Sequence, residues 1–342
     1  MLDLIAIGSL IVEFVRPEKD QPLDSIAPFI GPYPSGASAI TISTAARLGM
    51  KTGFVGIVGN DLFGRSVTNR MSSDGVNLDY LETIDGLQTG IAFVMYRSDG
   101  GREFNYILDY SRVSLATPRL DVDSLPRTKW IHIHGTMLGE KSIWRKYGFD
   151  AIEKVLADGG RLSFDSNFRP ELMDMKRCRA DFIPIIQRAT YFMPSEEEIL
   201  ALFDTADLTS AMKQALDLGP EIVCVKRAEK GCVVVSKSEG PHPIPPFVVD
   251  SIDPTGAGDS FDAAFIWARE RGLDISRSAR FANAVGAFAV TRRGPMEGSP
   301  FPHELIEMFD PEDADLKIVL KSSTNPCRSR QSEHIGNSKV VP

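Results

Sequence analysis

The chain has few cysteines, no excess of positive charge and no long apolar run. Its four cysteines in 342 residues form neither a C-x-x-C pair nor a cluster with histidine, which argues against a zinc site or a disulfide framework. Cys224 and Cys232 lie in apolar, strand-like runs, so we expect reduced, buried thiols and a cytoplasmic protein. The net charge of −8 argues against a nucleic-acid partner. No run approaches the roughly 20 apolar residues that span a bilayer, so we expect no membrane partner.

Short apolar runs alternate along the chain with segments of helical periodicity. The alternation predicts an α/β fold with a largely parallel sheet that helices cover on both faces. The first residues, MLDLIAIGSLIVEF, lack a basic leader and a cleavage site, so we interpret them as a buried strand and not as a signal peptide. The expected strands are residues 4–8, 52–58, 129–135, 161–165, 190–194, 221–226 and 246–250.

Three segments depart from this alternation. Residues 14–35 are rich in proline and polar groups, and residues 89–108 carry SDGG between two strand-like runs, which indicates a hairpin. We expect the segments at about 14–35 and 89–112 to form a small sheet over one edge of the main sheet. Residues 309–342 are polar and have little periodicity, which predicts a tail.

Residues 253–261, DPTGAGDSF, place two carboxylates around a small-residue turn. The flanking patterns predict a strand at 246–250, a glycine turn and then a helix. Glycines permit close approach to the backbone, and the N–H groups at a helix start bind anions. Asp259 has two interpretations at this point. It is either the N-cap of the helix or a base that accepts the proton of a hydroxyl attacking a phosphoryl group.

Two further patterns carry polar groups that bind metals in other proteins. His132 and His134 share one face of an expected strand, and we interpret them as ordinary strand residues, with His134 lining a pocket at the strand end. The run Glu196–Glu198 is either the favourable acidic first turn of a helix or a group that orders water around Mg²⁺.

Over roughly residues 4–308 the sequence resembles the ribokinase-like (PfkB-type) carbohydrate kinases. Residues 253–261 resemble the second signature of that family, and further segments resemble its other motifs in the same order. These are SGASAITISTAARLGMKTGFVGIVGNDLFG, LSFDSNFRPEL (the DxNxRP segment), MPSEEEILAL (the NxxE helix), VCVKRAEKGCVVV and ARFANAVGAFAVTRRG. The resemblance implies a ribokinase-like three-layer sandwich with a small β-sheet lid, one kinase domain over residues 1–308, and ATP-dependent phosphorylation of a sugar hydroxyl.

The resemblance also implies roles for single residues in the transfer of phosphate. Asp259 would be the base, and the backbone N–H groups of Gly256, Ala257 and Gly258 would form an anion hole. Glu198 would order water around Mg²⁺. ATP would contact Lys226, Ala228, Gly231 and Asn283. A monovalent cation such as K⁺ would lie near Asp253, Thr255, Val290, Arg293 and Ser299.

At the sugar end the resemblance implies a lid that also forms a dimer contact in many members. The sugar would contact Glu13, Gly36, Ile40, Tyr106, Asn167 and Arg169. Ile40 stands where the family usually has asparagine, and isoleucine removes a donor and an acceptor. Ile40 then either lines the pocket or packs beneath the lid. Glu13, Ser195 and Ala228 replace the usual aspartate, asparagine and glycine.

The acceptor therefore stays open. The first interpretation is a small carbohydrate. A sugar acid of the 2-keto-3-deoxygluconate type is an alternative because Arg169 would face a carboxylate, and a nucleoside is another because Ile40 makes the pocket less polar. A non-catalytic sugar or nucleotide sensor on the same fold is the alternative outside enzymes.

Overall fold

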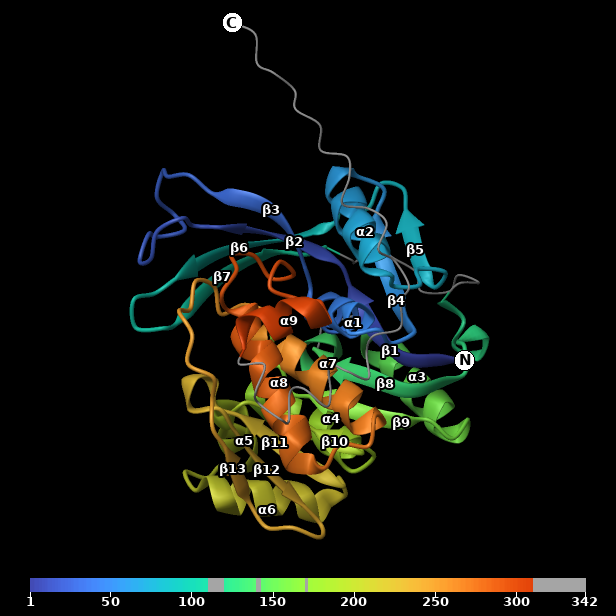
Figure 1. Cartoon of the computed structure of the whole chain (residues 1–342). Coiled ribbons are helices and arrows are strands. Elements are labelled where there is room, and N and C mark those ends of the chain that lie inside the picture. Colours follow the sequence, from blue (N-terminus) through green and yellow to red (C-terminus); the bar gives the residue numbers. More distant parts are fainter. Residues whose placement is uncertain (110–119, 140–142, 170–171, 310–342) are drawn as a thin grey trace, which may run out of the picture.

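A largely parallel sheet forms the centre of the chain (Figure 1). The computed structural model describes residues 1–109, 120–139, 143–169 and 172–309. Within these residues nine strands pair in the order β13-β12-β11-β10-β9-β8-β1-β4-β5, and β12 alone runs antiparallel to its neighbours. The strands are β1 (Leu2–Ser9), β4 (Thr52–Gly59), β5 (Leu81–Ile84), β8 (Thr128–His134), β9 (Arg161–Asp165), β10 (Tyr191–Phe192), β11 (Ile222–Lys226), β12 (Cys232–Ser236) and β13 (His242–Ile244).

Helices cover both faces of this sheet, which confirms the predicted three-layer architecture. Residues of β1 alternate between the layers: Leu4 and Ala6 belong to one buried cluster, and Ile5 and Ile7 to the other. Two-sided burial explains why the strands read as continuous apolar runs. The first cluster includes residues of α1 (Ala37–Arg47), α2 (Leu62–Asp74), α7 (Ala257–Glu270), α8 (Ile275–Ala289) and α9 (Pro302–Met308). The second includes residues of α3 (Trp144–Ala157), α4 (Met175–Ile186), α5 (Glu196–Phe203) and α6 (Leu208–Leu218).

A separate four-stranded sheet, here called the small sheet, has the strand order β3-β2-β6-β7. Its strands are β2 (Ile11–Val15), β3 (Ile30–Ser35), β6 (Gly90–Tyr96) and β7 (Arg102–Ile107). The predicted hairpin is confirmed, because β6 and β7 pair antiparallel with Tyr96 opposite Arg102 around the SDGG turn. Val15, Ala92 and Val94 form an apolar cluster of this sheet. Figure 1 shows the small sheet above α1 and α9.

The predicted strand at residues 246–250 is wrong. β13 ends at Ile244, and Pro245 and Pro246 follow without the N–H groups that a strand ladder needs. The segment runs instead as an irregular loop, which Asn283 holds at its start by donating from Nδ2 to the carbonyl oxygens of Ile244 (3.3 Å) and Pro245 (2.9 Å). The predicted glycine turn and helix after this loop are present.

Three further expectations concern the cysteines, membrane-spanning helices and the C-terminal tail. Cys178, Cys224 and Cys232 are buried free thiols. Among the described helices, none is both long enough and apolar enough to cross a membrane. The expected tail, apart from Phe309, and residues 110–112 of the second small-sheet segment lie outside the described residues.

Ile40 packs beneath the start of α7. Its side chain is 2% exposed and belongs to the first buried cluster. A Cβ atom added to Gly256 would lie 3.2 Å from Cγ2 of Ile40, so the two residues are in close contact. Next to it, the Thr41 hydroxyl donates to the backbone oxygen of Asp259 (3.2 Å). α1 thus supports the turn that precedes α7, and contact of Ile40 with a sugar stays a prediction.

We expect Ile40→Asn to lower the free energy of unfolding by roughly 2–4 kcal/mol, because the change removes apolar contacts and buries an amide. The order of preference among sugars should not change. Ile40→Val is the matched control and should cost about 1 kcal/mol. Denaturant unfolding and rates on a sugar panel check both points. Wild-type stability with a changed order of preference would place residue 40 in the sugar pocket instead.

Candidate active site

The turn before α7 presents unpaired backbone N–H groups. Gly256 is the N-cap in a left-handed conformation (φ 83°), and a Cβ atom there would lie 2.5 Å from the carbonyl oxygen of Pro295. The first N–H groups of a helix have no partner within it, so those at Ala257 and Gly258 are available to an anion. The ammonium of Lys226 lies beside them, 3.5 Å from the position of a Cβ atom on Gly258. This arrangement is a positively polarised cradle.

Asp259 is not the N-cap of α7, so that interpretation is wrong. It lies in the first turn, where its side chain is free to point away from the helix start. Its Oδ1 atom lies 3.2 Å from Nδ2 of Asn167 and 3.0 Å from Nε2 of His134. Asn167 has a positive φ of 36° and donates its own N–H to Asp165 (3.1 Å). Asp259 itself is 8% exposed, and both of its contacts use the same oxygen, Oδ1.

Lys226 lies between two buried carboxyl groups. Its Nζ atom is 2.9 Å from Asp165 and 3.0 Å from Asp262. Burial disfavours the ammonium, but the two aspartates outweigh burial and raise the pKa of Lys226. Burial raises the pKa of Asp262 well above its usual range, whereas Lys226 and His134 lower the pKa of Asp165 to about 2 despite its burial. The ammonium of Lys226 therefore lies between two buried carboxyl groups whose pKa values are shifted in opposite directions.

Glu198 joins the start of α5 to the loop after β9. Its carboxylate accepts hydrogen bonds from the N–H of Ser195 (2.9 Å), the hydroxyl of Ser166 (2.8 Å) and the N–H of Phe168 (2.9 Å). Ser195 in turn caps the helix by accepting from the N–H of Glu198. The acidic first turn is thus present, and Ser195 and Glu198 form a capping box at its start. Ordering of water around Mg²⁺ stays a prediction.

Glu13 brings a buried carboxyl group from the small sheet. It is 4% exposed, Oε1 accepts from the Ser35 hydroxyl (2.5 Å), and Oε2 is buried without a hydrogen-bond partner among the described residues. Burial raises the pKa of Glu13 to about 7; the Ser35 bond opposes this rise and the nearby Asp253 adds to it. A buried oxygen without a partner is costly unless a ligand binds it.

Asp253 connects the small sheet to two loops beside α7. Its carboxylate accepts from the Tyr96 hydroxyl, the N–H of Thr255 (2.9 Å) and the N–H of Gly294 (2.9 Å). The Tyr96 hydroxyl also lies 2.7 Å from Oγ1 of Thr255. The carbonyl oxygen of Val290 accepts from the N–H groups of Ile252 (2.7 Å) and Asp253 (3.1 Å). The loops predicted to hold a monovalent cation thus lie together.

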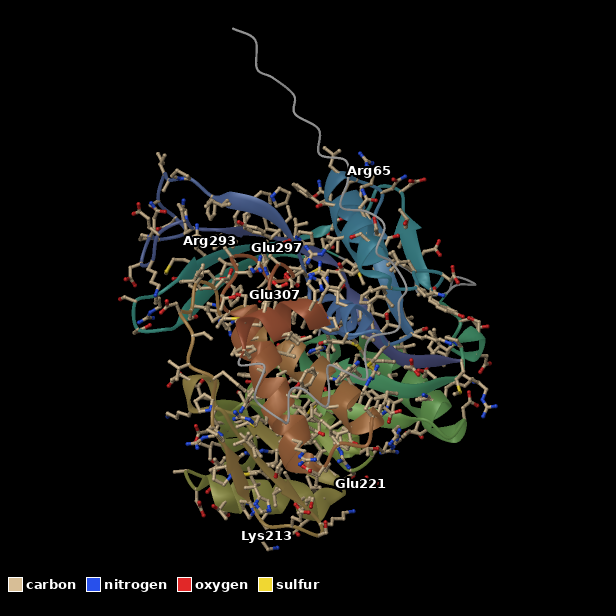
Figure 2. All side chains as sticks on the ribbon, viewed as in Figure 1. Arg65, Lys213, Glu221, Arg293, Glu297 and Glu307 are labelled. Atoms are coloured by element: carbon tan, nitrogen blue, oxygen red, sulfur yellow. The ribbon has the colours of Figure 1, made fainter. Side chains whose placement is uncertain are left out.

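Two of the other predicted cation residues have different surroundings. The Ser299 hydroxyl accepts from the Thr44 hydroxyl (2.9 Å). The Arg293 side chain is exposed, with Nη2 3.5 Å from the carbonyl oxygen of Pro17, and Figure 2 shows it next to the small sheet. Its guanidinium therefore points toward the surface.

The predicted ATP residues beyond Lys226 shape one turn and one loop. Ala228 has a left-handed φ of 49°, the conformation that glycine adopts most readily. Gly231 also has a positive φ (81°), and a Cβ atom there would lie 2.2 Å from the carbonyl oxygen of Ile244. Asn283 holds the same part of the chain through Ile244 and Pro245. The remaining predicted sugar residues lie at the N-cap of α1 (Gly36), on β7 (Tyr106) and after β9 (Arg169).

Sequence reasoning placed His134 at a pocket but missed its contact with Asp259, and it missed the contact of Tyr96 with Asp253. The register of β8 against β9 pairs His134 with Asp165, so both side chains lie at the carboxyl ends of neighbouring parallel strands. That placement was available from the strand pattern, because such ends meet at one edge of a sheet. Tyr96 has no comparable local signal, since its contact with Asp253 joins the small sheet to the loop before α7.

Comparisons with known proteins agree with this geometry. The model of the pfkB family carbohydrate kinases matches residues 1–302. A fructokinase from Vibrio alginolyticus is 30% identical over 283 residues, which is 81% of this chain and 91% of that protein. A crystal structure of a candidate ribokinase II from E. coli, with ATP and Mg²⁺, is 34% identical with a TM-score of 0.81 and covers 94% of this chain and 100% of the other.

A fructokinase from Vibrio cholerae O395, solved with fructose, ADP and a calcium ion, is 25% identical with a TM-score of 0.76. The match covers 90% of this chain and 98% of that one. A double mutant of the same fructokinase was solved with fructose, ADP and a potassium ion.

We expect Glu13→Gln to stabilise the sugar-free protein increasingly as the pH rises. The folded pKa of about 7 lies above the ordinary value of 4.5, so the stability that the protonated group contributes is present below 4.5 and is lost as the pH rises through about 7. The shift corresponds to at most roughly 3 kcal/mol. Melting temperatures between pH 5 and pH 8 check the difference between variant and wild type.

Glu103→Gln, an exposed change on β7 of the same sheet, is the matched control and should show no such trend. A difference between Glu13→Gln and wild type that stays constant over this range would contradict the raised pKa.

Proposed function

The chain belongs to the PfkB family of carbohydrate kinases and is an ATP-dependent sugar kinase, and we propose that Asp259 is its catalytic base. The observation that carries this proposal is the position of the carboxylate, which directly follows the N–H groups of Ala257 and Gly258 at the start of α7. Asn167 and His134 both contact Oδ1, so Oδ2 is left without a partner in the described part of the chain. Oδ2 would face the sugar.

The proposed reaction is one direct transfer of the γ-phosphoryl group, in which each residue has a separate role. Asp259 accepts the proton of the sugar hydroxyl as its oxygen attacks the γ-phosphorus, and the bond from that phosphorus to the ADP oxygen breaks. The N–H groups of Gly256, Ala257 and Gly258 stabilise the charge on the transferring group, and Lys226 adds a positive charge beside them. Ala228, Gly231 and Asn283 would shape the nucleotide side of the site.

The metal ions differ in how well the residues fit them. A carboxylate offers about four acceptor positions, and Glu198 uses three, so one remains for a water on Mg²⁺. When bound, Mg²⁺ would neutralise charge on the phosphates. K⁺ fits only in part, because Asp253 already accepts from three donors and the carbonyl of Val290 from two. No step is therefore assigned to a monovalent cation.

We propose that the small sheet is a lid over a small sugar, with fructose as the first acceptor to test because similar proteins are fructokinases. The buried, unpartnered Oε2 of Glu13 would bind a sugar hydroxyl. Asn167, Arg169, Gly36 and Tyr106 would complete the pocket. The exposed side chains of Ile30 and Ile107 at the two edge strands of the lid would contribute to a homodimer contact.

A sugar acid is a second candidate, because the lid brings a second arginine to the sugar end. Arg102 on β7 is exposed to solvent, yet enough protein surrounds its guanidinium to lower its pKa, and the positive charge of Arg169 lowers that pKa further. Two guanidinium groups in one pocket favour a carboxylate. Arg102 begins β7, the same strand that carries Tyr106.

Asp259→Asn should lower kcat by about 10²–10⁴-fold or more, the range expected for loss of a general base. The affinity for ATP and the melting temperature should stay near those of the wild type. ADP release with fructose and a mass shift of the sugar by one phosphate measure turnover. Asp250→Asn, an exposed change in the loop before the turn, is the matched control. Turnover within a few-fold of wild type would remove Asp259 from its proposed role.

Arg102→Gln distinguishes the two acceptor classes. If the acceptor is a sugar acid, the change should raise KM for the acid by roughly tenfold or more and leave KM for fructose nearly unchanged, since a charge-assisted bond is lost. Arg97→Gln is the control, because Arg97 pairs with Asp99 in the exposed turn of the same hairpin. Equal changes for both acceptors would exclude a carboxylate at Arg102.

A further inference from the structure

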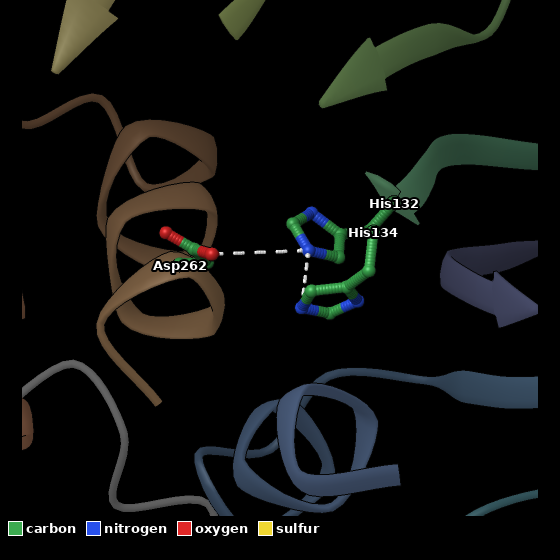
Figure 3. A group of neighbouring side chains, drawn as sticks. All are labelled: His132, His134 and Asp262. Atoms are coloured by element: carbon green, nitrogen blue, oxygen red, sulfur yellow. Dashed lines mark hydrogen bonds and ion pairs between the residues drawn. The ribbon is translucent and has the colours of Figure 1, made fainter. Parts of the chain in front are cut away.

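Two buried histidines end β8 directly beside the proposed base. His132 and His134 are 0% and 1% exposed, and their Nε2 atoms lie 3.3 Å apart. Figure 3 shows both rings projecting from the end of β8 toward α7, where Asp262 faces His132 at 3.9 Å. His134 Nε2 is also the atom that lies 3.0 Å from Oδ1 of Asp259. The proposed transfer of phosphate does not require this contact between His134 and Asp259.

The hydrogen bonds of His134 fix the position of its first proton. The Ser38 hydroxyl donates to the carbonyl oxygen of Ile7 (2.8 Å), so toward Nδ1 of His134, 3.3 Å away, it can only accept. Nδ1 of His134 therefore carries a proton. A neutral imidazole has one N–H, which would leave a lone pair on Nε2 facing a carboxylate oxygen at 3.0 Å. Two acceptors at that distance repel each other, so a further proton lies between them.

The charges around His134 support this extra proton. Asp259 faces it from α7, Asp165 from β9 at 3.9 Å and His132 from its own strand, and Lys226 on β11 contacts Asp165. Lys226 contacts both Asp165 and Asp262, and the charges of Arg102 and Arg169 also act on Asp259, so a proton shared with His134 adds to the compensation of the Asp259 carboxylate. An uncompensated buried charge is costly.

His132 does not take this role. Burial lowers the pKa of His132 well below its usual range, and the neighbouring His134 and Lys226 lower it further, against the opposing effect of Asp165. His132 is therefore neutral near neutral pH, and its Nδ1 atom lies 3.1 Å from the Ser163 hydroxyl.

We propose that His134 is a positioning residue, which shares a proton with Asp259 and thereby holds Oδ1 so that Oδ2 points toward the sugar. This inference rests on the proposed role of Asp259. The His134 N–H and the Asn167 amide then bind the same oxygen from two elements and fix the orientation of the carboxylate. Loss of the shared proton at high pH breaks the first of these bonds. The rate of transfer should therefore be lower at high pH, where this bond is lost.

The test compares His134→Gln and His134→Leu with wild type in single-turnover reactions, with saturating ATP and fructose, from pH 5.5 to pH 9.5. Glutamine donates a hydrogen bond at every pH, so the fall of the rate at high pH should vanish while most of the rate remains. Leucine donates none, and the rate should drop by about 10–100-fold, below the about 10²–10⁴-fold expected for loss of the base itself. The affinity for ATP should not change in either variant.

Matched controls separate this role from packing. His132→Gln changes an equally buried ring that does not contact Asp259, so the fall at high pH should persist in that variant. Asp262 and Lys226 are excluded as its source, because Lys226 has a raised pKa and Asp262 contacts His132 and Lys226 but not Asp259. If His134→Leu fails to fold, the pH profile of His134→Gln alone decides.

A wild-type pH profile in His134→Gln overturns the inference. So does a wild-type rate in a folded His134→Leu. These outcomes differ from failure of the proposed function: an active Asp259→Asn rejects the base itself, whereas an inactive Asp259→Asn with unaffected His134 variants rejects only the shared proton.

Discussion

The buried ion pairs of Lys226 connect the end of β9 to the start of α7, where the proposed catalytic residues lie. The ammonium joins Asp165 at the end of β9 to Asp262 in the second turn of α7, and it lies beside Gly258. Removal of one partner from such a pair costs roughly 3–5 kcal/mol because the other charge stays buried. The pairs therefore fix the sheet edge and the helix start relative to each other. This link also determines where Asn167 and Asp259 lie, because Asn167 is hydrogen-bonded to both Asp165 and Asp259.

The small sheet reaches the same helix start from the opposite side. Tyr96 contacts Asp253 and Thr255 in one loop, and Asp253 accepts from the backbone N–H of Gly294 in the other, so Asp253 connects the small sheet to both loops beside the turn at Gly256. Glu13 adds a carboxyl group whose ionisation near neutral pH depends on what binds to it. A sugar that satisfies Glu13 would thus join the lid to the base by contacts on both sides. Such a lid would shield phosphoryl transfer from water.

Departures from the family pattern occur at positions with different consequences. Ser195, in place of the usual asparagine, caps α5 because its hydroxyl accepts the backbone N–H of Glu198. Ala228 keeps the left-handed turn of glycine at a cost of about 1 kcal/mol. Ile40, in contrast, cannot replace the hydrogen bonds of an asparagine and packs against Gly256 instead. Ser195 and Ala228 thus keep the local backbone structure at their positions, whereas Ile40 contributes apolar packing.

The sequence by itself determined the layers, the hairpin, the glycine turn and the family, because these depend on local periodicity, on backbone conformation and on the order of motifs along the chain. The strand predicted at residues 246–250 is absent because Pro245 and Pro246, both visible in the sequence, prevent the ladder that the β-branched residues after them would favour. Only the tertiary structure decided that Asp259 lies in the first turn of α7 and not at its N-cap, that His134 faces it, and that Tyr96 reaches Asp253. These contacts join elements far apart in the chain, and their distances depend on how β8, β9, α7 and the small sheet pack. Side-chain packing over such separations leaves no periodic trace in the sequence.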